Sequence, residues 1–243
     1  MSRYFFISDL HLSAETPEII QRFAGFTQSL EPTDRLYILG DLFDAWVGDD
    51  DDSDFALQVQ QIIANAADHG VVISVMHGNR DFMIGDDFCR QNHVQLLDDP
   101  QQIEIAGTPY LLTHGDQLCS DDVQYLQARQ MRMQPQWLEA ARAKPLDERR
   151  QIAMAYRQMS GEAKSNLAAD IMDVNQHAVV DWFRTHQVTK MIHGHTHRPD
   201  THTYEVDGQL CTRHVLDQWH EDAGMALFID QSGEVKRLVL GNL

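Results

Sequence analysis

Five short polar motifs, each placed directly after an apolar segment, constrain the fold of this chain more than any other feature. They are Asp9-Leu10-His11, Gly40-Asp41, Gly78-Asn79-Arg80-Asp81, His114-Gly115-Asp116 and Gly194-His195-Thr196-His197. The apolar segments before them, at 3–8, 35–39, 71–76, 110–113 and 190–192, are typical of buried strands. Amphipathic helices expected at 17–30 and 54–68 alternate with the first three strands, which predicts a parallel-type sheet flanked by helices. Polar groups that follow such strands converge at one edge of the sheet, where ligands bind.

The segment 122–186 breaks this pattern, because it shows helical periodicity and no convincing strand. Interruptions are expected at Pro135, Pro145 and Gly161. We therefore predict a helical cap, approximately 122–186, inserted into a single domain that spans 1–243. Further strands are expected at 103–106, 203–206, 210–215, 225–229 and 235–240, with a hairpin turn at Asp207-Gly208.

The cap segment also concentrates basic and adaptable apolar side chains. Residues 126–166 hold eight basic side chains against four acidic ones, in a chain with 19 Lys and Arg: Arg129, Arg132, Arg142, Lys144, Arg149, Arg150, Arg157 and Lys164. The same stretch holds four of the ten methionines and Trp137. Methionine and tryptophan suit an apolar groove. The alternative is that these residues form the core and the solvated faces of an ordinary helical hairpin.

Bulk properties exclude several classes of protein. A formal charge of −18 argues against a nucleic-acid binder, which needs a basic surface. A phosphorylated substrate remains compatible, because bound metal ions would reverse the local sign. Three cysteines without CxxC spacing predict neither disulfides nor a zinc–thiolate site, which suits a reducing cytoplasm. Asp9 stands too early for a signal peptide, and no stretch reaches the ~18 apolar residues of a membrane span.

The chemical side chains of the five motifs are carboxylates, a carboxamide and imidazoles. Oxygen and nitrogen donors without thiolate favour Mn, Fe or Zn. Seven candidate ligands are too many for one ion that keeps an open position, so we expect two ions to share them: Asp9, His11, Asp41, Asn79, His114, His195 and His197. Most single histidines are structural, and this is the expectation for His69, His77, His93, His177, His186, His202 and His214.

In this order the motifs resemble those of the calcineurin-like metallophosphoesterases, with Asp44 and Asp81 completing the second and third motifs. The resemblance implies an α/β fold (α+β in some schemes), a β-sandwich flanked by helices. It implies one ion held by Asp9, His11, Asp41 and His197, and a second held by Asp41, Asn79, His114 and His195. Asp41 would bridge the ions, and Asp44 and Asp81 would orient ligands. Ions roughly 3.5–4 Å apart would clamp a phosphoryl group and generate an attacking hydroxide, so no protein nucleophile is needed.

Arg80 departs from the general pattern of that class, where a histidine often protonates the leaving group. Arginine cannot donate a proton usefully, but its planar fork suits phosphate oxygens. An enzyme without this acid needs a leaving group that is already good, such as a phosphate. Arg80 therefore favours cleavage of a pyrophosphate over cleavage of an alkyl phosphomonoester.

A narrower resemblance rests on GNRDF at 78–82, THGDQLCSDD at 113–122, IMDVN at 171–175 and IHGHTHRP at 192–199. These segments are similar to those of the UDP-2,3-diacylglucosamine hydrolases of lipid A biosynthesis. The family resemblance implies hydrolysis of that substrate to UMP and 2,3-diacylglucosamine 1-phosphate, with two Mn²⁺ ions. It also implies a peripheral protein on the cytoplasmic face of the bacterial inner membrane, whose cap holds the acyl chains and whose basic surplus meets anionic lipid.

The same resemblance assigns roles to individual side chains. The catalytic set would be the seven metal ligands together with Arg80. Substrate contacts would be Asn79, Arg80, Asp122, Ser160 and His195. Lys164 and Leu167 depart from the family, where asparagine and lysine are common at these positions, but Lys164 could still reach a phosphate or a sugar hydroxyl.

Two rival functions remain open from the sequence. One is a nucleotide pyrophosphatase or cyclic phosphodiesterase on the same two-metal scaffold, which would not need a basic, methionine-rich cap. The other is a metal-free interaction scaffold, which would be expected to have lost metal ligands. A nucleic-acid exonuclease is disfavoured by the negative charge.

Overall fold

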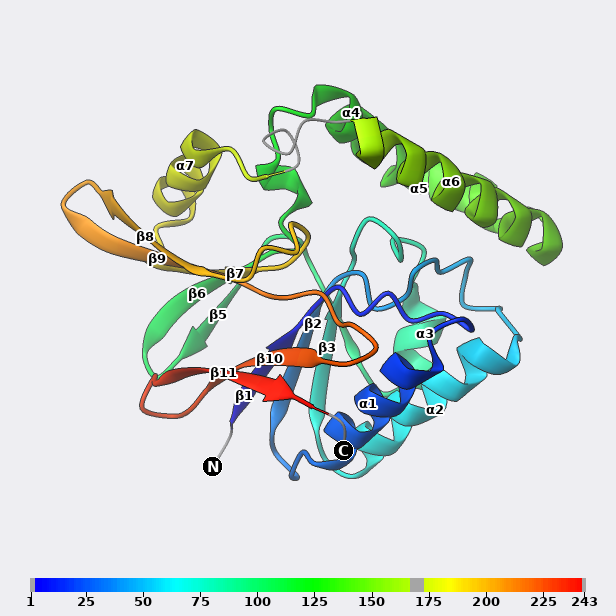
Figure 1. The fold of residues 1–243 in the computed structure, drawn as a ribbon, viewed down its shortest axis with the longest axis horizontal. Helices are drawn as coiled ribbons and strands as arrows, with labels where there is room; N and C mark the ends of the chain where they lie inside the picture. The colour runs from blue at the N-terminus through cyan, green and yellow to red at the C-terminus, as the bar shows by residue number, and fades with distance from the viewer. Residues whose placement is uncertain (1–2, 167–172, 242–243) are drawn as a thin grey trace.

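Two β-sheets pack face to face, and helices cover their outer faces (Figure 1). The computed structural model describes the backbone of residues 3–166 and 173–241 and the side chains of 3–156 and 173–241. The first sheet has the order β11-β10-β1-β2-β3-β4, formed by Val235–Leu240, Gly224–Ile229, Tyr4–Ile7, Arg35–Leu39, Val72–Met76 and Gln95–Leu97. The second has the order β5-β6-β7-β9-β8, formed by Gln101–Ile105, Thr108–Leu112, Lys190–His193, Gln209–Val215 and Thr201–Val206.

Strands β1 to β4 run parallel, as the alternation of strands and helices predicts. Successive side chains of a strand point to opposite faces, so each strand serves two cores. In β1, Phe5 and Ile7 join the core beneath the helices, while Phe6 joins the core between the two sheets. The inner strands β1, β2, β3 and β10 are therefore buried on both faces, which explains why they are largely continuous apolar runs.

Helices α1 (Pro17–Gln28), α2 (Asp54–Asp68) and α3 (Asp86–Gln91) cover the outer face of the first sheet. Pro17 occupies the first turn of α1, and the hydroxyl of Ser53 caps α2 by accepting the N–H of Ala56. Helix α7 (Gln176–His186) covers the second sheet, where Val179 and Phe183 join a core with residues of β6 and β7.

Helices α4 (Val123–Arg132), α5 (Pro135–Arg142) and α6 (Leu146–Asn166) follow the loop and short 3-10 helix after β6 and lie above the sheets in Figure 1. Pro135 begins α5, and α6 starts directly after Pro145, where the sequence predicts breaks. The predicted interruption at Gly161 is wrong, because α6 continues through it. A glycine inside a helix costs only about 1 kcal/mol relative to alanine, which the rest of a long helix offsets.

All the predicted strands are confirmed, with bounds that differ by at most a few residues. Sequence reasoning missed α3 and β4, which are too short to show periodicity. Among the described residues, no helix combines the length and apolar character needed to cross a bilayer.

Candidate metal centre

Each predicted metal ligand lies in a loop that follows the C-terminal end of a strand. Loops after β1, β2 and β3 of the first sheet supply Asp9, His11, Asp41 and Asn79. Loops after β6 and β7 of the second sheet supply His114, His195 and His197. The two sheets together bring all seven side chains to one place.

The backbone of these loops is unusual. Five of the seven residues have a left-handed conformation: Asp9 (φ 54°), His11 (φ 48°), Asp41 (φ 52°), His195 (φ 69°) and His197 (φ 54°). This conformation costs an L-residue roughly 1–2 kcal/mol. Such strain persists where the surrounding structure imposes it, and it concentrates at functional sites.

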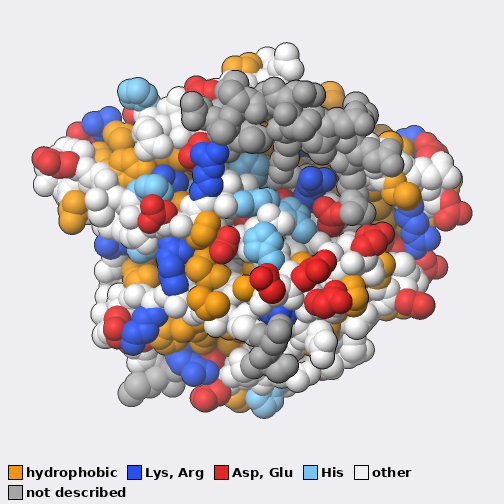
Figure 2. Space-filling model, viewed as in Figure 1, with side chains coloured by type: hydrophobic (Ala, Val, Ile, Leu, Met, Phe, Trp, Pro, Cys, Tyr) orange, Lys and Arg blue, Asp and Glu red, His pale blue; other side chains and the backbone are white. Residues whose placement is uncertain are grey.

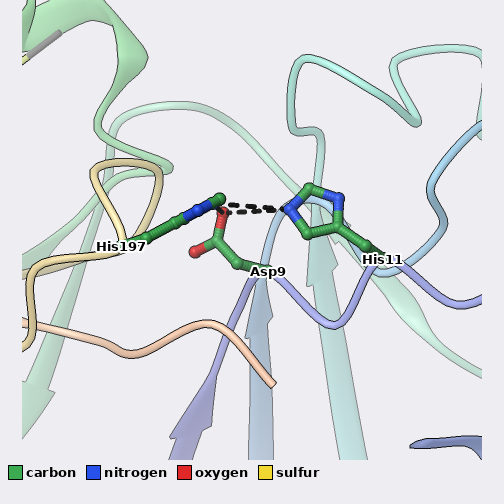
Figure 3. A group of neighbouring side chains, drawn as sticks. All are labelled: Asp9, His11 and His197. Atoms are coloured by element: carbon green, nitrogen blue, oxygen red, sulfur yellow. Dashed lines mark hydrogen bonds and ion pairs between the residues drawn. The ribbon is translucent and has the colours of Figure 1, made fainter. Parts of the chain in front are cut away.

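Asp9, His11 and His197 form a first group, in which the two rings converge on one carboxylate (Figure 3). Nε2 of His197 lies 3.2 Å from Oδ1 of Asp9 and 3.4 Å from Nε2 of His11. Asp41 borders the same group, since its Oδ2 lies 3.8 Å from Nε2 of His11. The second oxygen of Asp9 accepts the hydroxyl of Ser8 at 2.6 Å, so Oδ1 is the oxygen that faces the rings.

Asn79, His114 and His195 form a second group beside the first. Oδ1 of Asn79 lies 3.1 Å from Nε2 of His114 and 3.0 Å from Nδ1 of His195. Oδ1 of Asp41 lies 3.9 Å from Nε2 of His114. Asp41 therefore borders both groups, one through each oxygen, as a bridging carboxylate must. Figure 2 shows histidines gathered on this face, with acidic side chains beside them.

The donor atoms fit two divalent cations. Nδ1 of His114 lies 2.9 Å from the carbonyl oxygen of Leu39 and donates its hydrogen there. Nε2 then faces the amide oxygen of Asn79, to which it donates a hydrogen bond when the ring is protonated; in the neutral ring its lone pair would be available to a cation. With metal–ligand bonds of about 2.1 Å, neighbouring ligands of an octahedral ion lie about 3.0 Å apart. Within the groups the spacings run from 3.0 Å between Asn79 and His195 to 4.0 Å between Asp9 and His11, at or somewhat beyond this separation.

Burial and mutual charge shift the pKa values of these groups. Burial, assisted by the charges of Asp81 and Asp9, raises the pKa of Asp41 to about 8 although His114 opposes the shift. Burial opposes the charged form of His114, but Asp41 and other acids outweigh it and raise its pKa to about 9. Burial would raise the pKa of Asp9, yet the hydrogen bond to His197 and nearby imidazoles hold it well below its usual range. Binding of cations would displace the protons of the first two groups.

Asp81 ties two of the ligand loops together. Its carboxylate accepts the backbone N–H groups of Gly78 at 2.7 Å, Leu42 at 2.8 Å and Asp41 at 3.3 Å. A Cβ at Gly78 would lie 2.1 Å from Oδ1 of Asp41, so only glycine lets these loops approach so closely. The other predicted orienting residue, Asp44, has its Oδ1 4.0 Å from Nδ1 of His11.

A cavity of about 180 Å³ adjoins the second metal group. Asn79 and Arg80 line it on the side of the metal centre. The loops after β2 and β3 and the helices α5 and α6 contribute most of its remaining wall, which is largely apolar: Trp46, Val47, Phe82, Met83, Trp137, Ala141, Ile152, Ala153 and Tyr156. The charged side chains of Asp44, Arg132, Lys144 and Arg149 also border it. Helices α5 and α6 and the loops after β2 and β3 therefore enclose a largely apolar chamber directly beside the candidate metal centre.

The other predicted substrate contacts lie in different settings. Asp122 caps α4, where its Oδ1 accepts the N–H of Tyr125 at 3.0 Å. The side chains of Ser160 and Lys164, and residue Leu167, lie outside the described residues. The roles of Asp122, Ser160 and Lys164 stay predictions.

Several basic side chains of α4 and α6 form ion pairs or cation–π contacts with other residues of the protein. Arg149 is buried and bonds Asp50 at 2.7 Å, and Arg150 bonds Asp51 and Asp52 at 2.6 and 2.8 Å. Lys144 pairs with Glu148, Arg129 pairs with Asp99 and Asp116, and Arg132 stacks on Phe82, Tyr125 and Tyr156. The charge of these residues therefore does not by itself favour contact with an anionic membrane.

Sequence reasoning assigned no role to several buried polar residues around the centre. Asp116 belongs to a recognised motif, but its partner Arg129 and the neighbouring Asp99 lie in segments without a motif. His193 is buried, bonds Arg213 at 2.8 Å, and has its pKa lowered to about 3 mainly by burial. Neither metal group, within the described residues, includes any of the seven histidines predicted to be structural.

Comparison with known proteins gives two consistent results. A family model described as calcineurin-like phosphoesterase matches residues 2–199. The chain is 44% identical to a UDP-2,3-diacylglucosamine hydrolase of Pseudomonas aeruginosa over 229 residues, which cover 94% of this chain and 95% of the relative. It is 43% identical to the enzyme of that name from Marinobacter nauticus, with 89% of each chain covered. For that from Aromatoleum aromaticum the identity is 42%, over 90% of this chain and 89% of the relative.

Proposed function

Because the chain belongs to the calcineurin-like phosphoesterases, and within them to the UDP-2,3-diacylglucosamine hydrolases, we propose that it cleaves the pyrophosphate bond of UDP-2,3-diacylglucosamine. The products are UMP and 2,3-diacylglucosamine 1-phosphate, and the reaction belongs to lipid A biosynthesis. The observation that carries this proposal is the position of Arg80, which lines an apolar chamber directly beside a two-metal centre. A pyrophosphate that joins a nucleotide to a lipid requires both environments side by side.

The side chains of the centre have distinct tasks in this reaction. The seven proposed ligands would hold two ions, which would supply an activated water and Lewis acidity toward the phosphoryl group. Asp41 borders both groups of ligands and sets their separation, while Asp81 fixes the loops that carry Asp41 and Asn79. Arg80 presents a planar cationic fork to the pyrophosphate and stabilises charge that develops on the departing phosphate. No proton donor is needed, because that phosphate is a good leaving group.

We propose Mn²⁺ as the metal at both positions. Carboxylate, carboxamide and imidazole donors suit Mn²⁺, and the absence of thiolate among the seven proposed ligands disfavours a soft-metal site. We also propose the cytoplasmic face of the inner membrane as the place of action, with the protein bound peripherally. The support for this location is the substrate, whose acyl chains belong to a bilayer and whose nucleotide belongs to water.

The helical cap, predicted at approximately 122–186, is proposed to hold the acyl chains. Trp137, Ile152 and Tyr156 place apolar surface in the chamber, which supports this role for α5 and α6. Helix α7 packs on the second sheet, so its contribution would be to anchor the cap. Asp122, Ser160 and Lys164 are proposed as additional contacts to the sugar or phosphate.

The reaction can be tested on the purified protein with UDP-2,3-diacylglucosamine and Mn²⁺. We expect UMP and 2,3-diacylglucosamine 1-phosphate in equal amounts, no turnover after chelation, and recovery when Mn²⁺ is restored. Release of UDP or of free phosphate would refute the proposed bond cleavage. Full turnover in the presence of the chelator would refute the metal-dependent mechanism.

A further inference from the structure

Two side chains on one face of α4 bind the loop that carries the metal ligand His114. The hydroxyl of Tyr125 donates to Oδ2 of Asp116 at 2.5 Å, and Nε of Arg129 donates to the same oxygen at 2.6 Å. Tyr125 and Arg129 are four residues apart, which places them on the same side of the helix. The first cap helix is thus attached two residues beyond a metal ligand.

Arg129 also reaches His114 from a second direction. Its Nη2 donates to Oδ2 of Asp99 at 2.8 Å, in the loop between β4 and β5. The other oxygen of Asp99 accepts the hydroxyl of Thr113 at 2.6 Å and the backbone N–H of His114 at 3.3 Å. Arg129 therefore connects the carboxylate that accepts the backbone N–H of His114 with the carboxylate that stands two residues after it.

The burial of these groups makes the connection strong. The side chains of Asp99 and Asp116 are 6% and 1% exposed, and that of Arg129 is 18% exposed. Two carboxylates buried near each other repel and need a shared cation. Among the described side chains, Arg129 is the basic residue whose bonds reach both. Without it, at least one carboxylate would lose its compensation and the bonds to Thr113 and His114 would change.

We propose that Arg129 is a positioning residue that couples the docking of α4 to the placement of His114. Occupation of the second metal group and seating of the cap on the domain then stabilise each other. The coupling is reciprocal, so the amount by which docked α4 favours the metal equals the amount by which the metal favours docked α4. This inference rests on the proposed role of His114 as a metal ligand.

The far end of the cap offers a matched control. Arg150 of α6 forms the same kind of arginine–aspartate bond, with Asp51 and Asp52. Those aspartates lie in the loop between β2 and α2, well beyond Asp41, which is the nearest proposed metal ligand in sequence. Loss of Arg150 therefore weakens a cap contact without touching the supports of His114.

The coupling can be measured by titrating Mn²⁺ into the metal-free protein and following the signal of free Mn²⁺ by electron paramagnetic resonance. We expect the wild type and Arg150→Met each to bind two Mn²⁺ ions. In Arg129→Met we expect one of the two affinities to fall about 10- to 100-fold, as for other residues that orient a ligand. Arg129→Lys keeps the charge but not the planar fork, so its Mn²⁺ affinity should lie between those of the wild type and Arg129→Met. Wild-type affinity for both ions in Arg129→Met would overturn the proposal.

Hydrogen exchange tests the reciprocal effect, which is the stabilisation of docked α4 by bound metal. This test remains possible if Arg129→Met does not fold, because it uses the wild type and Arg129→Lys. Saturating Mn²⁺ should slow exchange of the amides of α4 in the wild type, and should slow it less in Arg129→Lys. Equal protection of α4 by Mn²⁺ in the two proteins would overturn the coupling. Failure of the wild type to bind two ions would instead refute the proposed metal centre, so the two failures are distinguishable.

Discussion

The backbone N–H of Arg80 donates a hydrogen bond of 2.8 Å to Oδ1 of Asp41. That oxygen is the one that faces the second metal group, where it lies 3.9 Å from Nε2 of His114. The residue proposed to bind the pyrophosphate and the carboxylate proposed to bridge the ions are therefore fixed relative to each other. This main-chain hydrogen bond therefore fixes the site proposed for the substrate's pyrophosphate relative to the site proposed for the metal ions.

Replacing Arg80 should reduce catalysis more than substrate binding, because its charge stabilises the departing phosphate. We expect Arg80→Ala to lower kcat by about 10²–10³-fold, the range seen when one donor to a developing anion is removed. Arg80→Lys should recover part of the loss as a point charge without the fork. Steady-state kinetics with the diacylated substrate measure both values. A loss confined to KM would show that Arg80 only binds the ground state.

Replacing the bridging carboxylate should be more severe. Asp41→Asn keeps the size of the side chain but removes the charge shared by both metal groups. Activity should fall by about 10³-fold or more, the equivalent of several kcal/mol of lost metal stabilisation. Asp52→Asn, which removes an exposed acid paired with Arg150, is the matched control and should keep activity. Both variants would be assayed at saturating Mn²⁺. Near-wild-type activity of Asp41→Asn would contradict the proposal that Asp41 bridges the two ions.

Adding one methyl group at Gly78 should disrupt the centre without removing a ligand. The new Cβ would lie 2.1 Å from Oδ1 of Asp41, so the two ligand loops must separate. We expect Gly78→Ala to lose roughly 1–3 kcal/mol of unfolding free energy, as overpacked sites do. It should also weaken Mn²⁺ binding. Gly241→Ala, where a Cβ meets nothing within 4 Å, should match the wild type in chemical denaturation and Mn²⁺ titration.

Metal binding should release protons at neutral pH. In the metal-free protein, the pKa of Asp41 is raised to about 8 and that of His114 to about 9, and since the charge of Asp41 is what raises the pKa of His114, the two together hold at least one proton at pH 7. Each proton must leave before the ion binds, so affinity for Mn²⁺ should rise by up to about tenfold per pH unit per proton. The rise should end near pH 9. Calorimetry in buffers of different ionisation enthalpy counts the protons, and no release at pH 7 would contradict these pKa shifts.

The sheet, and the position of the seven proposed ligands at strand ends, could be predicted from the sequence because strands and polar loops have local signals. A run such as 35–39, followed by Gly40-Asp41, identifies a buried strand and a polar loop without knowledge of any partner. The structure confirms β2 at Arg35–Leu39 and α2 at Asp54–Asp68 with the predicted bounds. The placement of these motifs after parallel strands predicted that the loops converge at one edge, and the family resemblance implied how they divide into two groups.

The connections between the cap and the centre could not be predicted, because they join segments far apart in sequence. Arg129 bonds Asp99, thirty positions away, and Arg149 bonds Asp50, ninety-nine positions away. A cluster of basic residues therefore resembled a free basic surface, although tertiary partners neutralise much of it. Asp99 stands in no motif, and only the fold shows that it holds the backbone of His114.

A comparison of substrates with and without acyl chains tests the proposed function most directly, because turnover of the lipid substrate requires the metal centre and the apolar chamber together. Turnover by the Mn²⁺-loaded protein would be compared for UDP-2,3-diacylglucosamine and for UDP-N-acetylglucosamine, which has the same pyrophosphate and no long acyl chain. We predict release of UMP from the first and a value of kcat/KM for the second that is lower by several orders of magnitude. Equal turnover of both would contradict the lipid assignment and favour a general nucleotide pyrophosphatase.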